Sequence, residues 1–261
     1  MPELPEVEVF RRQVEGQVLG RRVAKVTANR PEPLNLPLDK WRKRTSGAKV
    51  VGVERRGKAL LFHLDNGQCV FVHLRMGGRV WWQPSKEVAE EGVSVAIHVD
   101  GGGALVFDRL QLGQVHLYTE EELASIPFLA EMGPDPLSEE FTQSVFDGLV
   151  QGKCKVLKAL LCDQTVVGGI GNEYSAEILW EAKIHPEAGA DQLTKAKRRR
   201  LYQAVREVLG RAVVQGATYG KQPFRVVGRE GEKCPRCSAK IVKIKFGGRG
   251  TYLCPKCQKG Q

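Results

Sequence analysis

The chain has 261 residues, 42% of them hydrophobic and 27% charged, which is ordinary for a globular protein of one or two domains. It contains no run of about 18 apolar residues, so no membrane-spanning helix is predicted, and its N-terminus lacks the pattern of a secretory signal. We therefore expect a cytoplasmic protein, in which seven cysteines would not form a disulfide framework. The net charge of +10 arises after Leu137, because acidic and basic residues balance before it. Such asymmetry indicates either a polyanionic partner or a solvated basic face.

The first part of the chain is predicted to hold one helix followed by short strands. The helix has Pro5 in its first turn, apolar residues from Val7 to Val18 on one face, and ends at Gly20. Segments rich in Val, Leu and Phe predict strands at 22–28, 49–56, 58–64, 68–74, 94–99 and 104–107. Hairpin turns are expected at 65–67 and 100–103. This order predicts a β-sandwich or a flattened barrel behind the helix.

The second part follows the turn-rich stretch 132–138 and is predicted to be helical. Apolar periodicity indicates helices at 141–149, 156–162, 173–182 and 195–216. The last of these starts with the basic sequence KAKRRR, which is either a DNA-facing patch or a solvated helix end.

The last part carries the most specific local pattern, two Cys-X-X-Cys pairs with 16 residues between them. Two such pairs close a tetrahedral zinc site in a zinc ribbon, and a tail of this size needs a metal to fold. Two redox motifs are the alternative. We expect one structural Zn²⁺, held by Cys234, Cys237, Cys254 and Cys257. The remaining cysteines are expected to be ordinary core or surface thiols; they are Cys69, Cys154 and Cys162.

The opening sequence MPELPEVE allows two interpretations. Proline and acidic residues suit the start of a helix. Alternatively, removal of Met1 leaves Pro2 with a free secondary amine beside a carboxylate. An α-amino group titrates close enough to neutral pH that a useful fraction is unprotonated and can act as a nucleophile.

Three separated stretches resemble one family. MPELPEVE, GIGNEYSAEILWEAKIHP and GRGTYLCPKCQ are similar to the formamidopyrimidine-DNA glycosylase and endonuclease VIII (Fpg/Nei) family, in the same order and over nearly the whole chain. The resemblance implies an α+β multidomain fold, with an N-terminal helix and β-sandwich in 1–132, a helix–two-turns–helix domain in 133–227 and a zinc-ribbon finger in 228–261. It also implies a bifunctional DNA glycosylase and abasic-site lyase of base excision repair, which binds double-stranded DNA containing an oxidised base or an abasic site.

The resemblance implies three catalytic residues. Pro2 is expected to attack C1′ of the damaged nucleotide and form a Schiff base, which is followed by β,δ-elimination. Glu3 is expected to act as general acid and proton shuttle at O4′; Glu6 is a weaker candidate. Lys58 is expected on a strand, holding a phosphate beside the lesion, although the residue alone would suggest an ordinary exposed lysine.

Further residues are expected to bind DNA. Asn172, before a helix, and Arg249, between the strands of the zinc ribbon, would grip phosphates; Asn172 could also be a helix N-cap. Met76 would enter the gap left by a flipped nucleotide, although a methionine is more often a core residue.

The chain departs from the family at two places. Members of the family carry the motif D-P-R-x-F-G, in which the Arg pairs with the orphaned base and the Phe wedges the stack. This motif corresponds to Asp108–Gly113 in this chain. Leu110 stands at the Arg position and Leu112 at the Phe position. An aliphatic wedge is possible at Leu112, whereas readout of an opposing cytosine is in question, and Arg109 is displaced by one place. The connection Gly216–Arg229 is short where the family has a longer insertion that closes over 8-oxoguanine. We expect 8-oxoguanine to be a poor substrate relative to formamidopyrimidines, hydantoins or oxidised pyrimidines.

Two other functions fit parts of the sequence. A catalytically silent lesion- or DNA-binding protein of the same fold would share the zinc site and the basic C-terminal half, but would not need Pro2 and Glu3. A different N-terminal-proline enzyme, such as a tautomerase, would need neither the basic surface nor the zinc ribbon. We expect a monomer that is associated with the bacterial nucleoid through DNA binding.

Overall fold

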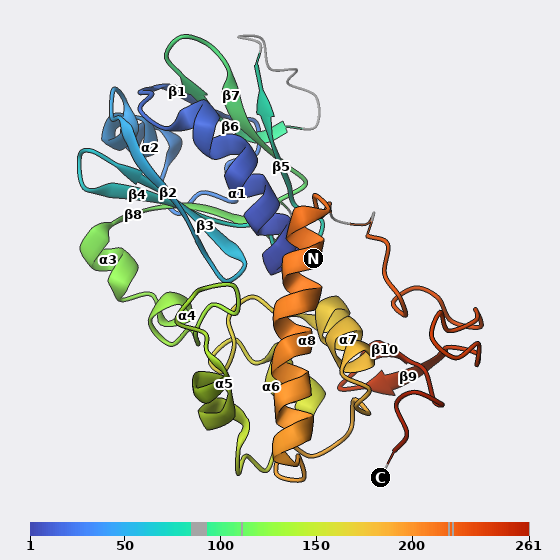
Figure 1. Ribbon diagram of the computed structural model, residues 1–261. Coiled ribbons are helices and arrows are strands. Elements are labelled where there is room, and N and C mark those ends of the chain that lie inside the picture. The colour runs from blue at the N-terminus through green and yellow to red at the C-terminus, as the bar shows by residue number, and fades with distance from the viewer. Residues whose placement is uncertain (85–92, 111, 219, 221, 261) are drawn as a thin grey trace. The chain divides into compact units, whose positions relative to one another are not determined.

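The computed structural model describes residues 1–84, 93–110, 112–218, 220 and 222–260 (Figure 1). They form two compact units, one of Met1–Pro2 and Glu6–Ala130 and the other of Glu3–Pro5 and Glu131–Gln261. The three-domain boundaries given above are a finer division and stay a prediction. Within the described part of the chain, no helix has the length and apolar character needed to cross a membrane.

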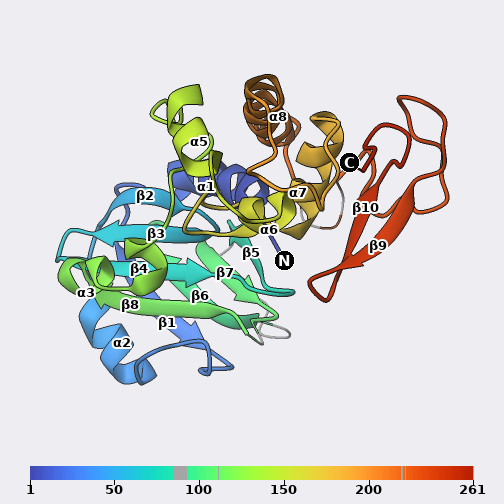
Figure 2. The same ribbon diagram turned by 90° about the horizontal axis from the view of Figure 1, so that it is seen from below.

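The first unit is a β-sandwich behind a helix, as the sequence predicts. Helix α1 (Leu4–Val18) precedes two four-stranded antiparallel sheets, which Figure 2 shows from below. One sheet has the order β1-β6-β7-β5, with bounds Val23–Ala28, Val93–Val99, Ala104–Asp108 and Arg79–Gln83. The other has the order β2-β3-β4-β8, with bounds Val50–Arg56, Ala59–Leu64, Gln68–His73 and Gln114–Thr119. Three short helices complete the unit: α2 (Leu38–Thr45), α3 (Glu120–Ala124) and α4 (Pro127–Ala130).

The two sheets and α1 share one hydrophobic core. Along β3, Leu60, Phe62 and Leu64 are at most 4% exposed and alternate with residues of the opposite face, while α1 contributes the buried residues Val14 and Val18. Burying a side chain of this size stabilises the fold by roughly 1.5–3 kcal/mol, so the core fixes which face of each strand points inward. The six predicted strands are confirmed within one residue at each end, and both predicted hairpins are present.

Glu8 ties α1 to strand β2. Its carboxylate accepts hydrogen bonds from Arg11 (3.1 and 3.2 Å), Arg12 (2.7 Å) and Arg55 (2.9 Å). Burial alone would raise the pKa of Glu8, but the three guanidinium groups outweigh burial and lower it to about 2. The third acidic residue of the opening sequence therefore serves the fold.

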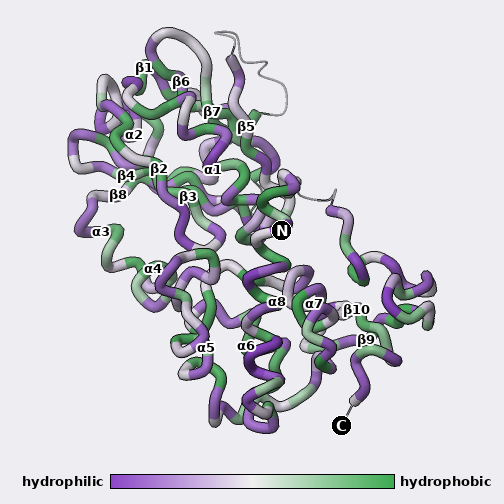
Figure 3. The backbone as a smooth tube through the Cα atoms, in the orientation of Figure 1, coloured by the Kyte–Doolittle hydropathy of each residue, from purple (hydrophilic) through white to green (hydrophobic). Residues whose placement is uncertain are grey.

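The second unit is helical and ends in a small hairpin. Its four main helices are α5 (Gln143–Val150), α6 (Leu157–Cys162), α7 (Asn172–Glu181) and α8 (Lys195–Val214), and its strands are β9 (Val242–Phe246) and β10 (Arg249–Leu253). The four predicted helices are confirmed with small shifts at their ends. Thr194 caps α8 by accepting a hydrogen bond from the N–H of Lys197. Along α8, buried residues such as Leu201, Val205 and Leu209 alternate with polar ones, which gives the green and purple stretches of Figure 3.

The basic start of α8 is partly structural. Arg198 donates to Asp147 Oδ1 (3.3 Å) and to Leu193 O (2.7 Å), and Arg200 donates to Ala182 O (2.6 Å). These bonds fasten the helix to neighbouring segments of its own unit. At least two of the basic side chains in KAKRRR therefore serve the fold, which weakens the interpretation of this stretch as a DNA-facing patch.

Candidate active site

The carboxylate of Glu3 lies at the N-terminus of α7, where backbone groups hold it. Oε2 accepts hydrogen bonds from the N–H groups of Gly171 (2.6 Å) and Tyr174 (3.4 Å), and Oε1 accepts one from Glu173 (3.0 Å). A helix N-terminus presents unpaired N–H groups and a partial positive charge, which stabilise an anion. The chain places Pro2 directly before this fixed carboxylate.

The glycine-rich loop before α7 receives the chain's own N-terminal segment. The Leu4 N–H donates to Gly169 O (3.0 Å), and Gly169 has a φ of +90°. A Cβ at Gly169 would lie 2.7 Å from the Leu4 side chain, so glycine is required there. Gln164 fixes the loop by accepting a hydrogen bond from the Gly169 N–H (2.9 Å). The anion at this helix N-terminus is therefore Glu3 itself.

Asn172 is the first residue of α7, and the N-cap is Gly171 rather than Asn172. The Asn172 Nδ2 donates to Gly250 O (3.0 Å) in β10. Arg249 precedes Gly250 as the first residue of β10, directly after the turn Gly247–Gly248, in which both residues have positive φ as in tight hairpins. Asn172 therefore holds the end of the hairpin that carries Arg249, and the structure brings these two predicted residues together.

A buried lysine supports the same helix end. Lys158 in α6 is 1% exposed, and its Nζ donates to Asn172 O (2.9 Å) and Ser175 Oγ (2.9 Å). Burial lowers the pKa of Lys158, against the opposing effects of Cys162 and of the Glu3 carboxylate. Sequence reasoning missed this residue, because a lysine within LKALLC looks like an ordinary helix-surface position.

The sulfurs of the four predicted zinc ligands converge. The Sγ atoms of Cys234 and Cys257 are 4.0 Å apart and those of Cys237 and Cys254 3.4 Å apart, and all four lie within 4.8 Å of one another. Tetrahedral zinc with Zn–S bonds of about 2.3 Å separates its sulfurs by roughly 3.8 Å. The residues fit the ion, and the finger holds one structural Zn²⁺ with no open coordination position.

The zinc finger is fastened to α7. Arg236, between the first two cysteines, lies 3.9 Å from the ring centroid of Trp180, and donates to Trp180 O (2.7 Å) and Glu181 Oε1 (2.7 Å). A guanidinium stacked on an indole and bonded to a carboxylate is a strong local attachment. The zinc-dependent fold thus helps to place Arg249 beside Asn172.

Two of the predicted residues in the first unit lie on loops. Lys58 is in the two-residue turn Gly57–Lys58 between β2 and β3, so its predicted position on a strand is wrong, and it is only 6% exposed. Met76 is 64% exposed on the loop after β4, as expected for a surface tip. In the same loop, Arg75 has a φ of +51° and its N–H donates to His73 Nδ1 (3.2 Å). Burial, with the charges of Arg75 and Lys58, lowers the pKa of His73 to about 4.

The two leucines of the divergent motif have different environments. Leu110 is 4% exposed in the core, and a Cβ on Gly113 would lie 2.4 Å from its side chain. Leu112 is 60% exposed, and the neighbouring Arg109 forms an ion pair with Asp108 (3.5 Å). Leu110 therefore belongs to the fold and cannot face a base, whereas Leu112 is available at the surface. Residue 111 lies outside the described residues.

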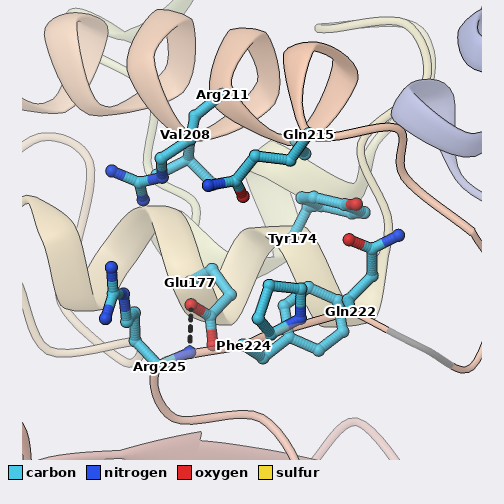
Figure 4. Close-up of a pocket in the computed structure, with 10 residues that line it drawn as sticks. Tyr174, Glu177, Val208, Arg211, Gln215, Gln222, Phe224 and Arg225 are labelled. Carbon is cyan, nitrogen blue, oxygen red and sulfur yellow. Dashed lines mark hydrogen bonds between the residues drawn. The ribbon is translucent and has the colours of Figure 1, made fainter.

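A pocket of about 140 Å³ lies between α7, α8 and the connection that follows α8 (Figure 4). Phe224 in this connection packs edge-on against Tyr174 with ring centroids 5.4 Å apart. Glu177 in α7 accepts hydrogen bonds from the N–H groups of Arg225 (2.9 Å) and Val226 (2.8 Å), and burial raises the pKa of Glu177. The described residues 222–226 are thus packed back onto α7.

A β-sandwich, a helical domain and a four-cysteine finger, with a carboxylate fixed directly after a potential N-terminal amine, define a DNA glycosylase of the helix–two-turns–helix class. The formamidopyrimidine-DNA glycosylase N-terminal domain matches residues 1–115, the H2TH domain of the same proteins matches 132–222, and the zinc finger found in FPG and IleRS matches 231–260. The chain belongs to the formamidopyrimidine-DNA glycosylase family.

Full-length relatives of this chain support the same family assignment. The formamidopyrimidine-DNA glycosylase of Streptococcus pyogenes is 36% identical over 274 residues, and that of Pelotomaculum thermopropionicum 35% identical, each covering 99% of both chains. The structure of Lactococcus lactis Fpg with DNA containing N7-benzyl-Fapy-dG has a TM-score of 0.91 at 31% identity. A structure of MutM with DNA containing carbocyclic 8-oxo-G has a TM-score of 0.89 at 32% identity. Both comparisons cover 99% of this chain and 100% of the other. The predicted fold class and family are confirmed.

Proposed function

We propose that this protein is a bifunctional DNA glycosylase and abasic-site lyase of base excision repair, which excises oxidised bases from double-stranded DNA as a cytoplasmic monomer. One observation carries the proposal. Three N–H groups at the start of α7 fix the Glu3 carboxylate, and Pro2 directly precedes it. The family supports the enzyme class, a DNA-formamidopyrimidine glycosylase-type hydrolase with lyase activity.

The first steps use Pro2 and Glu3. Once Met1 is removed, the Pro2 nitrogen attacks C1′ of the damaged nucleotide, so that an N–C1′ bond forms and the bond from C1′ to the base breaks; the departing base takes a proton from water. Glu3 accepts the proton released by the Pro2 nitrogen and delivers it to O4′, which opens the sugar ring and leaves an iminium. A carboxylate held by fixed N–H donors suits this shuttle, because its oxygens keep their position next to Pro2 in the chain.

The iminium then drives strand cleavage. Its positive charge acidifies the C2′ proton, which water accepts as the bond to the 3′ phosphate breaks. Loss of the C4′ proton to water then breaks the bond to the 5′ phosphate. Water finally hydrolyses the C=N bond and frees Pro2. Lys58, Asn172 and Arg249 would hold flanking phosphates, while Met76 and Leu112 would fill the space of the flipped nucleotide.

Borohydride trapping tests the nucleophile. Protein verified to lack Met1 is mixed with a duplex carrying one abasic site and with borohydride, which reduces the iminium to a stable amine. We expect a covalent adduct that mass mapping places on Pro2, and its loss in protein that retains Met1, because the Pro2 nitrogen is then an amide and cannot form an iminium. Tight DNA binding without an adduct would replace the proposal by a catalytically silent lesion- or DNA-binding protein.

The preferred lesion follows from two features of this chain. The connection after α8 has its described residues 222–226 packed onto α7, which leaves few residues to close over a flipped base. Buried Leu110 offers no donor to an opposing cytosine. These features support formamidopyrimidines, hydantoins and oxidised pyrimidines as substrates, and 8-oxoguanine as a poor one.

Single-turnover excision from one duplex sequence with different lesions tests this preference. We expect 8-oxoguanine opposite cytosine to be excised about tenfold or more slowly than a formamidopyrimidine, because contacts that would hold the intact purine are missing. The same lesion opposite each of the four bases is the internal control, and we expect little discrimination between them. Equal rates for 8-oxoguanine and the formamidopyrimidine would contradict the proposed preference while leaving the enzyme class intact.

A further inference from the structure

The outer face of the sheet β2-β3-β4-β8 carries a cluster of chemistry-bearing side chains that the proposed reaction does not use. His63 on β3 and Cys69 on β4 are direct partners in the antiparallel ladder, so their side chains leave the sheet side by side. Their neighbours Phe62 and Val70 point into the core on the other face. Glu120, the first residue of α3, reaches the same place from the end of β8.

The donor atoms of this cluster are close together. His63 Nδ1 lies 2.8 Å from Glu120 Oε1, and one donor atom from each of His63, Cys69 and Glu120 lies within 4.8 Å of the others. The second imidazole nitrogen, Nε2, lies 3.4 Å from Glu54 Oε2 on β2. Gly52 on β2 is the ladder partner of His63 and has no side chain to crowd the imidazole ring. A Cβ built on Gly52 would lie 3.6 Å from the His63 ring, so the ring is free to lie toward Glu54.

We propose that His63, Cys69 and Glu120 form a second metal site suited to Zn²⁺, separate from the four-cysteine finger. Thiolate, imidazole and carboxylate are the three ligand types that zinc takes in proteins, and a thiolate disfavours Mg²⁺ or Ca²⁺. Three protein ligands leave a fourth position for water. The site faces solvent through Glu120, whose side chain is 51% exposed, while the Cys69 residue is fully buried.

The geometry needs only small movements. Tetrahedral zinc at ordinary bond lengths separates its ligand atoms by roughly 3.3–3.6 Å when one is sulfur and the others are nitrogen or oxygen. The contact of 2.8 Å between His63 Nδ1 and Glu120 would open slightly as the metal replaces the proton between them. All donor separations are within 4.8 Å, and the exposed side chain of Glu120 can rotate to adjust its oxygen to the metal.

Glu54 has a distinct role in this site. A histidine that binds a metal through one nitrogen usually donates its other N–H to a carboxylate, which fixes the ring and its tautomer. Glu54 stands at that second nitrogen, so Nδ1 is the ligand atom and Glu54 a positioning residue. Loss of such a partner weakens metal binding by about 10- to 100-fold without removing a ligand.

Addition of Co²⁺ to the zinc-loaded, full-length protein tests the site, because a cobalt–thiolate bond absorbs strongly in the near ultraviolet. We expect one equivalent to bind and to give this absorbance. Cys69→Ser should abolish the absorbance, and Glu54→Gln should weaken binding about 10- to 100-fold. Cys154→Ser removes an exposed cysteine elsewhere in the chain and should change nothing.

Two further measurements keep the outcome decisive if Cys69→Ser folds poorly. Glu120→Gln alters an exposed side chain and should weaken Co²⁺ binding, whereas Glu121→Gln, the next glutamate, should not. The metal should also raise the unfolding temperature of the wild type, because it binds only the folded protein. Failure of the zinc-loaded protein to bind one equivalent of Co²⁺ at micromolar concentration, or equal binding by Cys69→Ser and Cys154→Ser, would show that the cluster is only a hydrogen-bonded ion-pair network.

Discussion

Replacing Glu3 by glutamine is expected to slow base excision and strand cleavage by about 10²- to 10⁴-fold, because glutamine cannot carry a proton from the Pro2 nitrogen to O4′. The substitution also has a structural cost. Glutamine keeps one oxygen, so its NH₂ group would face the N–H of either Gly171 or Glu173. A buried N–H without an acceptor costs about 1–3 kcal/mol, which would loosen the start of α7.

Single-turnover rates on a base-containing duplex, measured together with thermal unfolding, separate these two effects. Glu8→Gln is the matched control, since it removes another buried carboxylate of the same N-terminal segment. The lowering of the Glu8 pKa from 4.5 to about 2 corresponds to about 3 kcal/mol of stability. This contribution is present above pH about 4.5 and is lost as the pH falls toward 2, so the variant should be less stable at neutral pH.

The two variants should therefore differ in which property they lose, stability or reaction rate. Glu8→Gln should unfold at a lower temperature and keep its rate at 25 °C, whereas Glu3→Gln should lose its rate at a temperature where it is still folded. Activity that falls in proportion to stability in both variants would show that Glu3 acts only in folding. The proton shuttle would then have to be another group.

The sequence predicted those parts of the fold that short-range patterns control. Strands with an apolar face, such as β3, and turns such as Asp65–Gly67 are set by residues that are neighbours in the chain. The helix α2 was not predicted, because its sequence LDKWRKRT has one large buried residue, Trp41, among charged ones and shows no apolar stripe. Strand β5 was not predicted either, because its sequence RVWWQ lacks the strict alternation of apolar and polar residues that marks a half-buried strand.

The residues of the site could be predicted where a cysteine spacing or a family motif includes them, but their contacts could not. The four zinc ligands follow from spacing alone, and Glu3 follows from the resemblance. The surroundings of Glu3 do not, because its partners Gly171 and Tyr174 come from far along the chain. The burial of Lys158 and the approach of Glu120 to His63 likewise depend on packing between distant segments, which no local pattern encodes.

Removing the zinc ion is expected to weaken DNA binding at least tenfold while the β-sandwich unit stays folded on its own core. A structural zinc contributes an apparent 10–16 kcal/mol to the folding of a small finger. The finger's own core cannot replace that, because it consists of Val226, Ile241, Trp180 and the cysteines with a few half-buried neighbours. Without zinc, the hairpin β9–β10 should lose its register and Arg249 its position.

Cys254→Ser in the full-length chain provides the measurement, with Cys154→Ser as the control for removal of a thiol. DNA affinity is measured over a range of salt concentrations, because a protein that neutralises one phosphate fewer has a slope of log K against log salt that is less negative by about 1. We expect a reduced slope for Cys254→Ser and an unchanged slope for the control.

Arg249→Ala in the zinc-loaded protein identifies which side chain is responsible. This variant keeps the finger folded, so its slope should change by about 1. If Cys254→Ser changes the slope by the same amount, the finger acts on DNA through Arg249 alone. A larger change would mean that other cationic side chains of the finger, such as the exposed Lys243 and Lys245 of β9, also neutralise phosphates. Unchanged affinity and slope after zinc removal would contradict a role for the finger in DNA binding, and the phosphate grip would then have to come from other residues.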